Sequence, residues 1–336
     1  MTKRQIETLH SSGKFSGNTG IPELVETHIS WVFLCDSFVY KIKKPIHYSF
    51  LDFSTIEKRK YYCEREIELN RRLTDDMYID VQPVVENKGI FSIGNGKGAV
   101  LDHAVKMRKL DGDKQMNKLL QKDKVTKTDI QNLAVKIASF HSSTDIIYDK
   151  DIFDIHQKFI DLSSEKDYLQ GKLEMNSSYM IDRAIEVSGE FNEKNKELLA
   201  GRLHAGFYRD GHGDLHSRNI FLLPYPQPFD CIEFNDDFRQ IDVLNEIAFL
   251  CMDLDAFERR DLSDLFLDRY NNLFPSIKTE EENKLFIYYK SYRANIRAKV
   301  NSLRSRDARG DTEKNSILSE VSKYLLLMNH YIEKLT

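Results

Sequence analysis

Cysteine is scarce in this sequence, and long apolar runs are missing. The four cysteines (Cys35, Cys63, Cys231 and Cys251) lie far apart with no metal-type spacing, so we expect free, buried thiols and neither disulfides nor a zinc site. No apolar run approaches the roughly 18 residues of a membrane span. The first residues, MTKRQIETLHSSGKFSG, lack the apolar core of a secretion signal. These absences predict a cytoplasmic protein with no membrane partner.

An excess of positive charge is also missing. The 49 Lys and Arg residues against 53 Asp and Glu residues give a formal net charge of −4. The chain therefore has no global attraction to nucleic acid, and none is expected as a partner. What the sequence does have is length and apolar content, with 336 residues of which 41% are hydrophobic. This exceeds one average domain, so we expect two lobes that share a cleft.

Short, alternating apolar runs dominate the first third of the chain. The runs typical of strands occupy residues 23–45, 81–85, 89–93 and 99–107. The first is broken at Asp36-Ser37 and predicts a hairpin, while the glycine turn GNGKG at 94–98 separates the last two. This turn is not a phosphate loop, because it lacks the strand–loop–helix context and the Gly-Lys-Ser/Thr ending. Between this hairpin and the later strands we expect a helix. It begins at Ser54 or Thr55, either of which can cap it, and ends near Leu73.

Helical periodicity takes over beyond residue 110. It covers residues 128–142, 154–190, 194–207, 240–275 and 278–302. The exception is 211–235, where short apolar runs alternate with clustered Asp, Asn and His, and the charged segment 302–315 is expected to be a surface loop. We therefore predict an α+β fold. A small antiparallel-sheet N-lobe with one main helix is expected at 1–110, and a larger, mostly helical C-lobe at 111–336.

The polar cluster begins with HGDLHSRN at 212–219, in which Asp214 and Asn219 are five residues apart. Kinases use this separation to place a catalytic Asp and a metal-binding Asn on one short loop. Asp214 would accept or orient the proton of an acceptor hydroxyl, and Asn219 would give Mg²⁺ a neutral oxygen. His212 is a further catalytic candidate. The alternative is a polar loop closed by Asx turns.

A second metal ligand is expected fourteen residues after Asn219, at Glu233. Glu233 is an acid inside the apolar strand run Ile232-Glu233-Phe234, where kinase-like enzymes carry an Asp that chelates Mg²⁺ between the phosphates. It is one methylene longer than Asp but keeps the hard oxygen that Mg²⁺ prefers. Asp230, Asp236 and Asp237 compete for this role.

The first lobe supplies candidates for nucleotide binding. A kinase needs a strand Lys that holds the phosphates and a helix Glu that holds the Lys. Phe38-Val39-Tyr40-Lys41 has the form of the Val-Ala-Ile-Lys strand, and Lys43 lies on the same face by alternation. We choose Glu66 on the following helix, with Glu64 and Glu68 also available. Met107, which ends the last predicted strand, completes the set.

Three basic residues share one face of the predicted 278–302 helix: Lys290, Arg293 and Arg297. They predict a solvated basic face, and the alternative is a site for an anionic acceptor such as a sugar phosphate. His141, near the end of LAVKIASFHSS, is expected to be a structural residue packed between the lobes.

Together these residues resemble the aminoglycoside phosphotransferase superfamily, which has a protein-kinase-like fold and carries a His-Gly-Asp-Leu-His-x-x-Asn loop. The resemblance covers residues 26–73 and the segments HGDLHSRNIFL and DCIEFNDDFRQIDVLNEIAFLCMDLD. These segments resemble one uncharacterised bacterial branch of the superfamily. It implies Asp214 as catalytic base, Asn219 and Glu233 as metal ligands, Lys41 as phosphate contact and Glu66 as its partner. Two departures are the lack of a glycine-rich loop before residue 27 and the Glu at 233.

The expected function is a kinase that uses ATP or another NTP and Mg²⁺ to phosphorylate a hydroxyl of a small molecule. An anionic acceptor is one option, whereas drug-modifying pockets for polycationic sugars are usually acidic, so aminoglycoside resistance is not predicted. One alternative is a nucleotide-binding pseudokinase, which Glu233 favours and which Asp214 and Asn219 oppose. Another is phosphoryl or adenylyl transfer to a protein.

Overall fold

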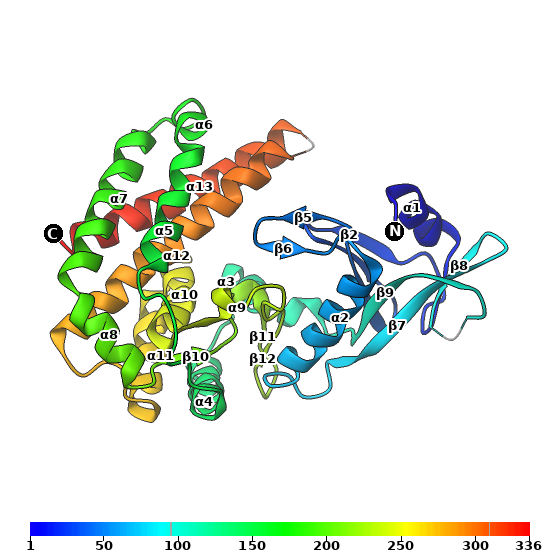
Figure 1. The fold of residues 1–336 in the computed structure, drawn as a ribbon, viewed down its shortest axis with the longest axis horizontal. Helices are drawn as coiled ribbons and strands as arrows, with labels where there is room; N and C mark the ends of the chain where they lie inside the picture. The colour runs from blue at the N-terminus through cyan, green and yellow to red at the C-terminus, as the bar shows by residue number, and fades with distance from the viewer. Residues whose placement is uncertain (95, 309) are drawn as a thin grey trace. The chain divides into compact units, whose positions relative to one another are not determined.

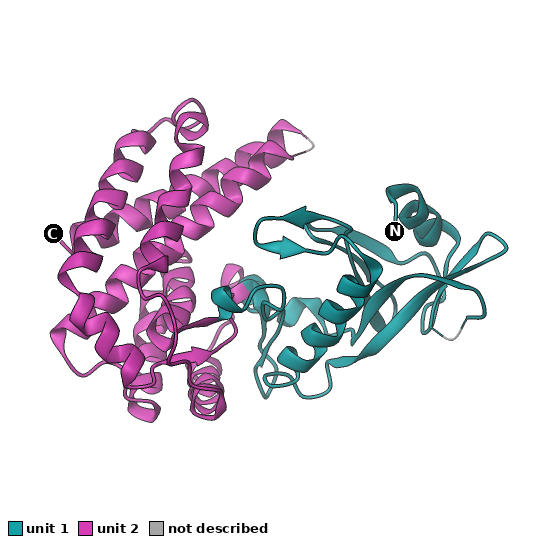
Figure 2. Cartoon of the chain, viewed as in Figure 1, with its two compact units in different colours: residues 1–119, 218–239 teal, residues 120–217, 240–336 magenta. Residues whose placement is uncertain are grey.

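The computed structural model describes residues 1–94, 96–308 and 310–336, so Asn95 of the predicted GNGKG turn and Arg309 of the predicted 302–315 loop lie outside the described residues. The chain forms two compact units (Figures 1 and 2). Unit 1 comprises residues 1–119 and 218–239, and unit 2 comprises residues 120–217 and 240–336. Unit 1 is built on a sheet and unit 2 is mainly helical, which confirms the predicted α+β fold. The stretch 218–239 belongs to unit 1. The single division predicted at residue 110 instead assigns this stretch to the C-lobe.

The sheet of unit 1 has seven strands in the order β1-β8-β7-β9-β4-β3-β2. Their bounds are β1 (Lys14–Phe15), β2 (Glu23–Glu26), β3 (Ser30–Leu34), β4 (Phe38–Lys43), β7 (Tyr78–Asn87), β8 (Ile90–Ile93) and β9 (Ala99–Arg108). All pairs are antiparallel except β1 with β8. The predicted hairpin is β3–β4, with Leu34 opposite Val39. A small ribbon of β5 (His47–Tyr48) and β6 (Leu51–Asp52) follows it and was not predicted.

The two faces of this sheet carry different cores because side chains alternate along each strand. Tyr40 and Ile42 of β4 belong to a buried cluster with Leu9 of α1 (Lys3–Ser12). On the opposite face, Met107 packs in a second cluster with Cys63 of α2 (Ile56–Asn70). Helix α2 confirms the predicted helix, whereas α1 was not predicted.

Local capping explains where these two helices begin. Thr55 accepts a hydrogen bond from the Lys58 N–H at 3.3 Å and starts α2. Thr2 and Gln5 form a reciprocal capping box at α1, with Thr2 N donating to Gln5 Oε1 at 2.7 Å. A run of only ten residues with few apolar positions is hard to distinguish from a polar leader, which is why α1 escaped the periodicity argument.

Unit 2 consists of helices around α10. Its main helices are α4 (Lys127–Ser143), α5 (Asp154–Ile160), α6 (Lys166–Gln170), α7 (Ser177–Lys194), α8 (Lys196–His204), α10 (Val243–Ala256), α11 (Arg260–Leu273), α12 (Glu280–Arg306) and α13 (Asp311–Glu333). Every residue of α10 except Asp255 is buried, as expected of a helix that is apolar on all sides. Strands β10 (Tyr208–Asp210) and β13 (Gln240–Asp242) pair at its start.

Two helix boundaries differ from the prediction. The expected helix at 154–190 is divided into α5, a 3₁₀ segment, α6 and α7. The surface loop expected at 302–315 is wrong, because α12 continues to Arg306 and α13 begins at Asp311. Ser302 is buried and donates a hydrogen bond to Glu165 at 2.7 Å, so tertiary contacts extend the helix into a segment of loop-like composition.

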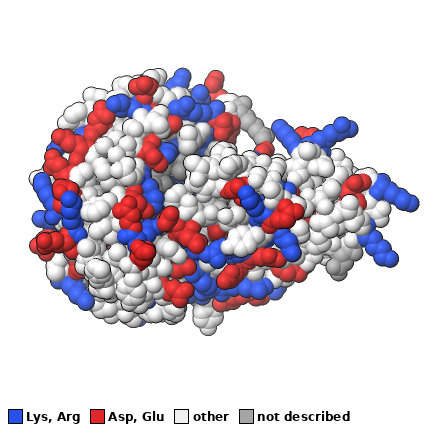
Figure 3. All heavy atoms as spheres, viewed as in Figure 1, with Lys and Arg blue, Asp and Glu red and all other residues white. Residues whose placement is uncertain are grey.

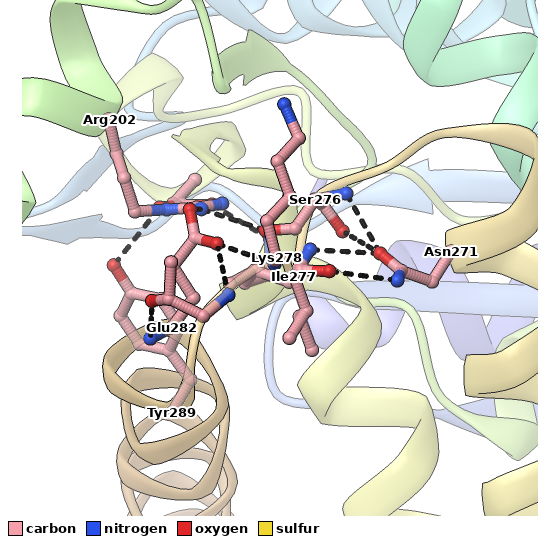
Figure 4. A network of polar contacts seen from close by, with 10 residues as sticks. Arg202, Asn271, Ser276, Ile277, Lys278, Glu282 and Tyr289 are labelled. Carbon is pink, nitrogen blue, oxygen red and sulfur yellow. Dashed lines mark hydrogen bonds and ion pairs between the residues drawn. The ribbon is translucent and has the colours of Figure 1, made fainter.

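A buried ionic network fixes the elements that carry the unit 2 residues described below (Figure 4). Arg202 of α8 donates to both oxygens of Asp242 at 2.6 and 2.9 Å, and also to Glu282 at 2.8 Å. Asp242 caps α10 by accepting from Leu244 N–H at 2.8 Å, and Glu282 lies in the first turn of α12. All donors of a buried guanidinium need partners, and here the partners join three helices.

The remaining expectations concern surface and composition. All four cysteines are buried and free, as expected. Within the described part of the chain, no helix combines the length and apolar character needed to cross a membrane. On the face drawn in Figure 3, acidic and basic side chains are interspersed.

Candidate active site

In unit 1 a single buried carboxylate binds two lysines. Glu66 Oε1 lies 2.8 Å from Lys41 Nζ, and its Oε2 lies 2.6 Å from Lys43 Nζ. Both lysines project from β4 toward α2 because they are two residues apart on one strand. Of the three glutamates considered, Glu66 is fully buried, whereas the side chains of Glu64 and Glu68 are more than half exposed. The structure thus brings together the predicted Lys41, Lys43 and Glu66.

Two further acids close this cluster from the segment after β12 (Gln227–Pro228). Asp230 Oδ1 lies 2.6 Å from Lys41 Nζ, and Glu233 forms an ion pair with Lys43. Asp230, Lys41, Glu66, Lys43 and Glu233 therefore form an alternating chain of charges, which we call the lysine cluster. It contains three carboxyl groups and two ammonium groups.

Glu66 and Glu233, the two buried carboxyl groups of the lysine cluster, differ in their affinity for protons. Burial opposes the charge on both. In Glu66 the two lysines outweigh burial and lower the pKa to about 2. In Glu233 burial prevails, helped by repulsion from Glu66, and the pKa is raised above its ordinary value. Both lysines have raised pKa values, because the carboxylates more than offset burial. The negative charge of Glu233 is thus less well compensated than that of Glu66.

Asp230 differs from its neighbours in exposure and backbone geometry. Its side chain is 45% exposed, and its backbone has φ of 61°, a left-handed conformation that Asp adopts more readily than most residues. The Asp230 N–H donates to the Tyr78 hydroxyl at 3.1 Å, and the next N–H, of Cys231, donates to Asn70 Oδ1 at 2.9 Å. These bonds hold the Asp230 carboxylate beside Lys41.

Asn219 and Met107, the other candidates in unit 1, are both buried. The Asn219 carbonyl accepts from Phe229 N–H at 2.9 Å, which ties it to the segment carrying Asp230. Met107 is part of the core beneath α2.

Among the described residues, no three His, Cys, Asp or Glu side chains are grouped to hold a metal. An open pocket of ≈270 Å³ contains none of the predicted residues and is lined by Asp75, Asp76, Met77, Leu110, Leu223, Pro224, Tyr225 and Gln227.

In unit 2 the loop before Asp214 is held by Glu246. The His212 N–H donates to both carboxylate oxygens of Glu246 at 2.9 Å. A Cβ at Gly211 would lie 1.8 Å from Glu246 Oε2, so any larger residue there would displace this carboxylate. Gly213 follows with φ of 85°, which glycine alone adopts without strain. The short segment 211–213 is therefore fitted around one carboxylate.

His141 supports Glu246 from behind. Its Nε2 lies 3.4 Å from Glu246 Oε1, and its Nδ1 lies 2.7 Å from the Tyr270 hydroxyl. Burial would raise the pKa of Glu246, but His141 and His212 lower it to about 2. His141 is thus structural, as expected, but these contacts lie inside unit 2, whereas the prediction packed it between the lobes.

Asp214 is oriented by the two histidines of its own loop. Its N–H donates to His212 Nδ1 at 3.2 Å, and its Oδ2 lies 3.3 Å from His216 Nε2. The side chain remains 37% exposed. Partial burial would raise the pKa of Asp214, but His216, Arg297 and His212 hold it well below its ordinary value. Asp214 is an ionised carboxylate in a fixed position.

The loop is anchored a second time after Asp214. Asp253 of α10 accepts from the Ser217 N–H at 2.9 Å and from its hydroxyl, and it is itself buried. Asp253 and Glu246 are seven residues apart, about two turns of one helix. The predicted site residue Asp214 is thus held between two buried acids of α10. The near-continuous apolar pattern of α10 gave no sign that these two acids anchor the loop.

The predicted solvated basic face of α12 is wrong. Arg293 and Arg297 are only 5% and 7% exposed, and Lys290 is paired with Asp255 at 2.5 Å. Arg293 donates to Asn245 Oδ1 at 2.7 Å and to the Gly213 carbonyl at 3.2 Å. The face is buried because α10 and α13 pack against α12, a tertiary effect that helical spacing alone does not reveal.

No protein-family model matches the chain. Two curated relatives are the uncharacterized proteins Rv2004c of Mycobacterium tuberculosis and Mb2027c of Mycobacterium bovis. Each is 27% identical over 318 residues, which is 93% of this chain. The chain spans 60% of the length of these relatives.

Two solved structures share the fold. A structure of APH(2")-IIia with GDP and kanamycin has a TM-score of 0.51 and 11% identity, and covers 99% of both chains. A GDP complex of a mutant aminoglycoside 2'-phosphotransferase-IIIa also has a TM-score of 0.51 and 11% identity, covering 93% of this chain and 91% of that one. At this identity the likeness shows the fold alone. The chain has the protein-kinase-like fold of aminoglycoside phosphotransferases, as the sequence predicted.

Proposed function

We propose that this chain, which has the aminoglycoside phosphotransferase fold, is a kinase that transfers the γ-phosphoryl group of ATP or another NTP to a hydroxyl of a small molecule. The observation that carries the proposal is Asp214, an ionised and partly exposed carboxylate. Buried acids of α10 hold its loop on both sides. Such rigid support for one accessible carboxylate is what a positioned catalytic group requires. Both compared structures contain GDP, which supports a nucleotide as the donor.

Asp214 would bind the acceptor hydroxyl and remove its proton. The hydroxyl oxygen forms a bond to the γ-phosphorus, the bond from that phosphorus to the bridging oxygen breaks, and the nucleoside diphosphate leaves. The hydroxyl proton passes to Asp214. Because the low pKa makes Asp214 a weak base, it orients the hydroxyl first and takes the proton late, as charge leaves the acceptor oxygen.

The lysine cluster would bind the phosphates of the nucleotide. Lys41 is the candidate for direct contact, since its partner Asp230 is 45% exposed and Glu66 holds it from the buried side. Lys43 is fully buried and would instead keep Glu66 and Glu233 in place. A kinase Lys held by a helix Glu performs this task in the fold class.

The donor set of unit 1 fits Mg²⁺. Glu233 offers carboxylate oxygens, and the burial that raises its pKa disfavours a negative charge that a bound cation would compensate. Asn219 offers the neutral amide oxygen that a hard cation accepts. We therefore propose Glu233 and Asn219 as the residues that hold Mg²⁺. When bound, the ion would neutralise charge on the transferring phosphates.

A metabolite-pool screen with γ-labelled ATP tests the function. Wild-type protein should transfer label to a small molecule in the presence of Mg²⁺, and Asp214→Asn should not, although it still binds nucleotide. Label transfer that is unaffected by Asp214→Asn would refute the role of Asp214.

A nucleotide-binding pseudokinase is the second candidate. It is favoured by Glu233, because this proposed metal ligand is already engaged in an ion pair with Lys43. Nucleotide binding without label transfer to any acceptor would select this function. Label that appears on added protein substrates, and on no small molecule, would instead select a protein-directed transferase.

A further inference from the structure

We infer that Arg297 of α12 binds an oxyanion group, phosphate or carboxylate, of the acceptor. This inference names the acceptor class for the proposed kinase and rests on that function. Arg297 is 7% exposed, and its Nε atom is buried with no hydrogen-bond partner among the described residues. Its guanidinium lies 5.5 Å from the ring of Tyr324, whose hydroxyl accepts a hydrogen bond from it. Within the described residues, no carboxylate lies at ion-pair distance from Arg297.

A second buried arginine of unit 2, Arg202, shows which hydrogen-bond acceptors Arg297 lacks. Arg202 is also buried, but it donates to Asp242, to Glu282 and to the Ser276 carbonyl. Figure 4 shows Arg202 beside Glu282 and Ser276. A buried guanidinium destabilises a fold unless its donors are satisfied and its charge is compensated. The fold provides Arg202 with hydrogen-bonded carboxylates, whereas Arg297 has only the longer-range attraction of Asp253 and Asp214, and its Nε donor has no acceptor among the described residues. A ligand anion would supply the missing acceptor.

The position of Arg297 connects it to the proposed chemistry. Asp214 and Asp253 act electrostatically on Arg297 and favour its charged form. Arg297 in turn is one of the groups that lower the pKa of Asp214. An acceptor with both a hydroxyl and an anionic group would therefore place the hydroxyl on Asp214 and the anion on Arg297. A second cationic group near Asp214 also disfavours polycationic acceptors.

Arg293 has a different task, although it lies one turn away on the same helix. Its Nε donates to Asn245 Oδ1 at 2.7 Å, and its Nη1 donates to the carbonyl of Gly213 at 3.2 Å. These bonds use its guanidinium to shape the backbone directly before Asp214. Arg293 is a positioning residue, and Arg297 is the residue available to the acceptor.

Kinetics with Arg297→Gln test the assignment. The acceptors that the wild-type protein labels should carry a negative charge before they are phosphorylated. Anion-exchange separation of the unlabelled acceptors measures this charge. For such an acceptor, Arg297→Gln should raise the KM about ten- to a hundred-fold, the equivalent of one charged hydrogen bond. The KM for ATP should change much less. Lys299→Gln is the matched control, because it removes a charge of α12 that is paired with Asp161 at the surface.

Anion binding without turnover provides a second readout. Inorganic phosphate and acetate, each compared with chloride at equal ionic strength, should raise the Tm of the wild-type protein more than that of Arg297→Gln. The anion with the larger effect identifies the phosphate or the carboxylate class. Arg297→Gln itself should leave the Tm unchanged or raise it, whereas a structural arginine predicts a loss. If Arg297→Gln does not fold, Arg297→Lys and the wild-type acceptor screen carry the same comparison.

The outcomes separate this inference from the function beneath it. Transfer to neutral or cationic acceptors that depends on Asp214 would overturn the anion site and keep the kinase. Anion stabilisation that depends on Arg297, without any transfer, would keep the anion site and overturn the kinase. Equal anion effects on Arg297→Gln and wild-type protein would overturn the inference directly.

Discussion

The charged groups of the two units are satisfied to different degrees. In unit 1, two lysines are bound by three carboxyl groups, so under the proposed function Lys41 would exchange Asp230 for a phosphate of the nucleotide. In unit 2, Asp214 remains partly exposed, and Arg297 keeps a buried donor without an acceptor among the described residues. The charged groups of unit 1 are thus paired with one another, whereas unit 2 keeps a buried donor without an acceptor among the described residues. Each prediction below tests one side of this difference.

The largest effect is expected in the lysine cluster on removal of Glu66. Glu66→Ala leaves two buried ammonium groups without their shared carboxylate, and breaking a buried pair costs roughly 3–5 kcal/mol. The free energy of unfolding, measured with urea, should fall by about that amount. Glu68→Ala on the exposed side of the same helix is the control and should stay within about 0.5 kcal/mol. Equal losses for the two variants would contradict a central role of Glu66.

Glu246 should produce a smaller, pH-dependent effect in unit 2. Its pKa is about 2 in the folded chain against an ordinary value of 4.5, so the folded state favours the ionised form. The resulting stability is fully present above pH 4.5 and is lost as the pH falls toward 2, by roughly 3 kcal/mol in total. Urea unfolding at pH 5 and pH 3 should show a smaller pH-dependent loss for Glu246→Gln than for wild-type protein. Identical slopes would show that Glu246 is not the anchor described.

The smallest effect is expected for Asp230, which is the exposed end of the lysine cluster. Asp230→Asn should free Lys41 for phosphate and tighten ATP binding a few-fold, since partly exposed ion pairs contribute about 1 kcal/mol or less. Asp76→Asn is the control, because it removes an exposed carboxylate of unit 1 that pairs with Arg108. Isothermal titration of both variants measures the difference. Weaker ATP binding by Asp230→Asn would instead assign Asp230 to the metal or the nucleotide.

Sequence reasoning succeeded where a pattern is local. Periods of two and 3.6 residues were enough to predict that Lys41 and Lys43 share one face and that Glu66 lies on the sheet-facing side of α2. The β3–β4 hairpin was predicted from the break at Asp36-Ser37. The Asp214 loop was recognisable because its residue types and spacing are specific. How these residues bind substrates remains a prediction.

What sequence reasoning missed depends on tertiary packing. Glu246 and Asp253 lie in a helix that is buried on all sides, so no amphipathic pattern showed that their carboxylates bind loop backbone. Arg293 and Arg297 looked solvated because helical spacing shows which residues share a face but not what covers it. The turn between α12 and α13 was overestimated because a charged composition is common to loops and to exposed helix ends.

The measurement that tests the central claim most directly is the rate of label transfer by Asp214→Asn relative to Asp268→Asn, which removes an exposed carboxylate of α11. Loss of a positioned general base predicts a rate about 10²- to 10⁴-fold lower for Asp214→Asn, with ATP affinity retained. Equal rates for the two variants would contradict phosphoryl transfer centred on Asp214.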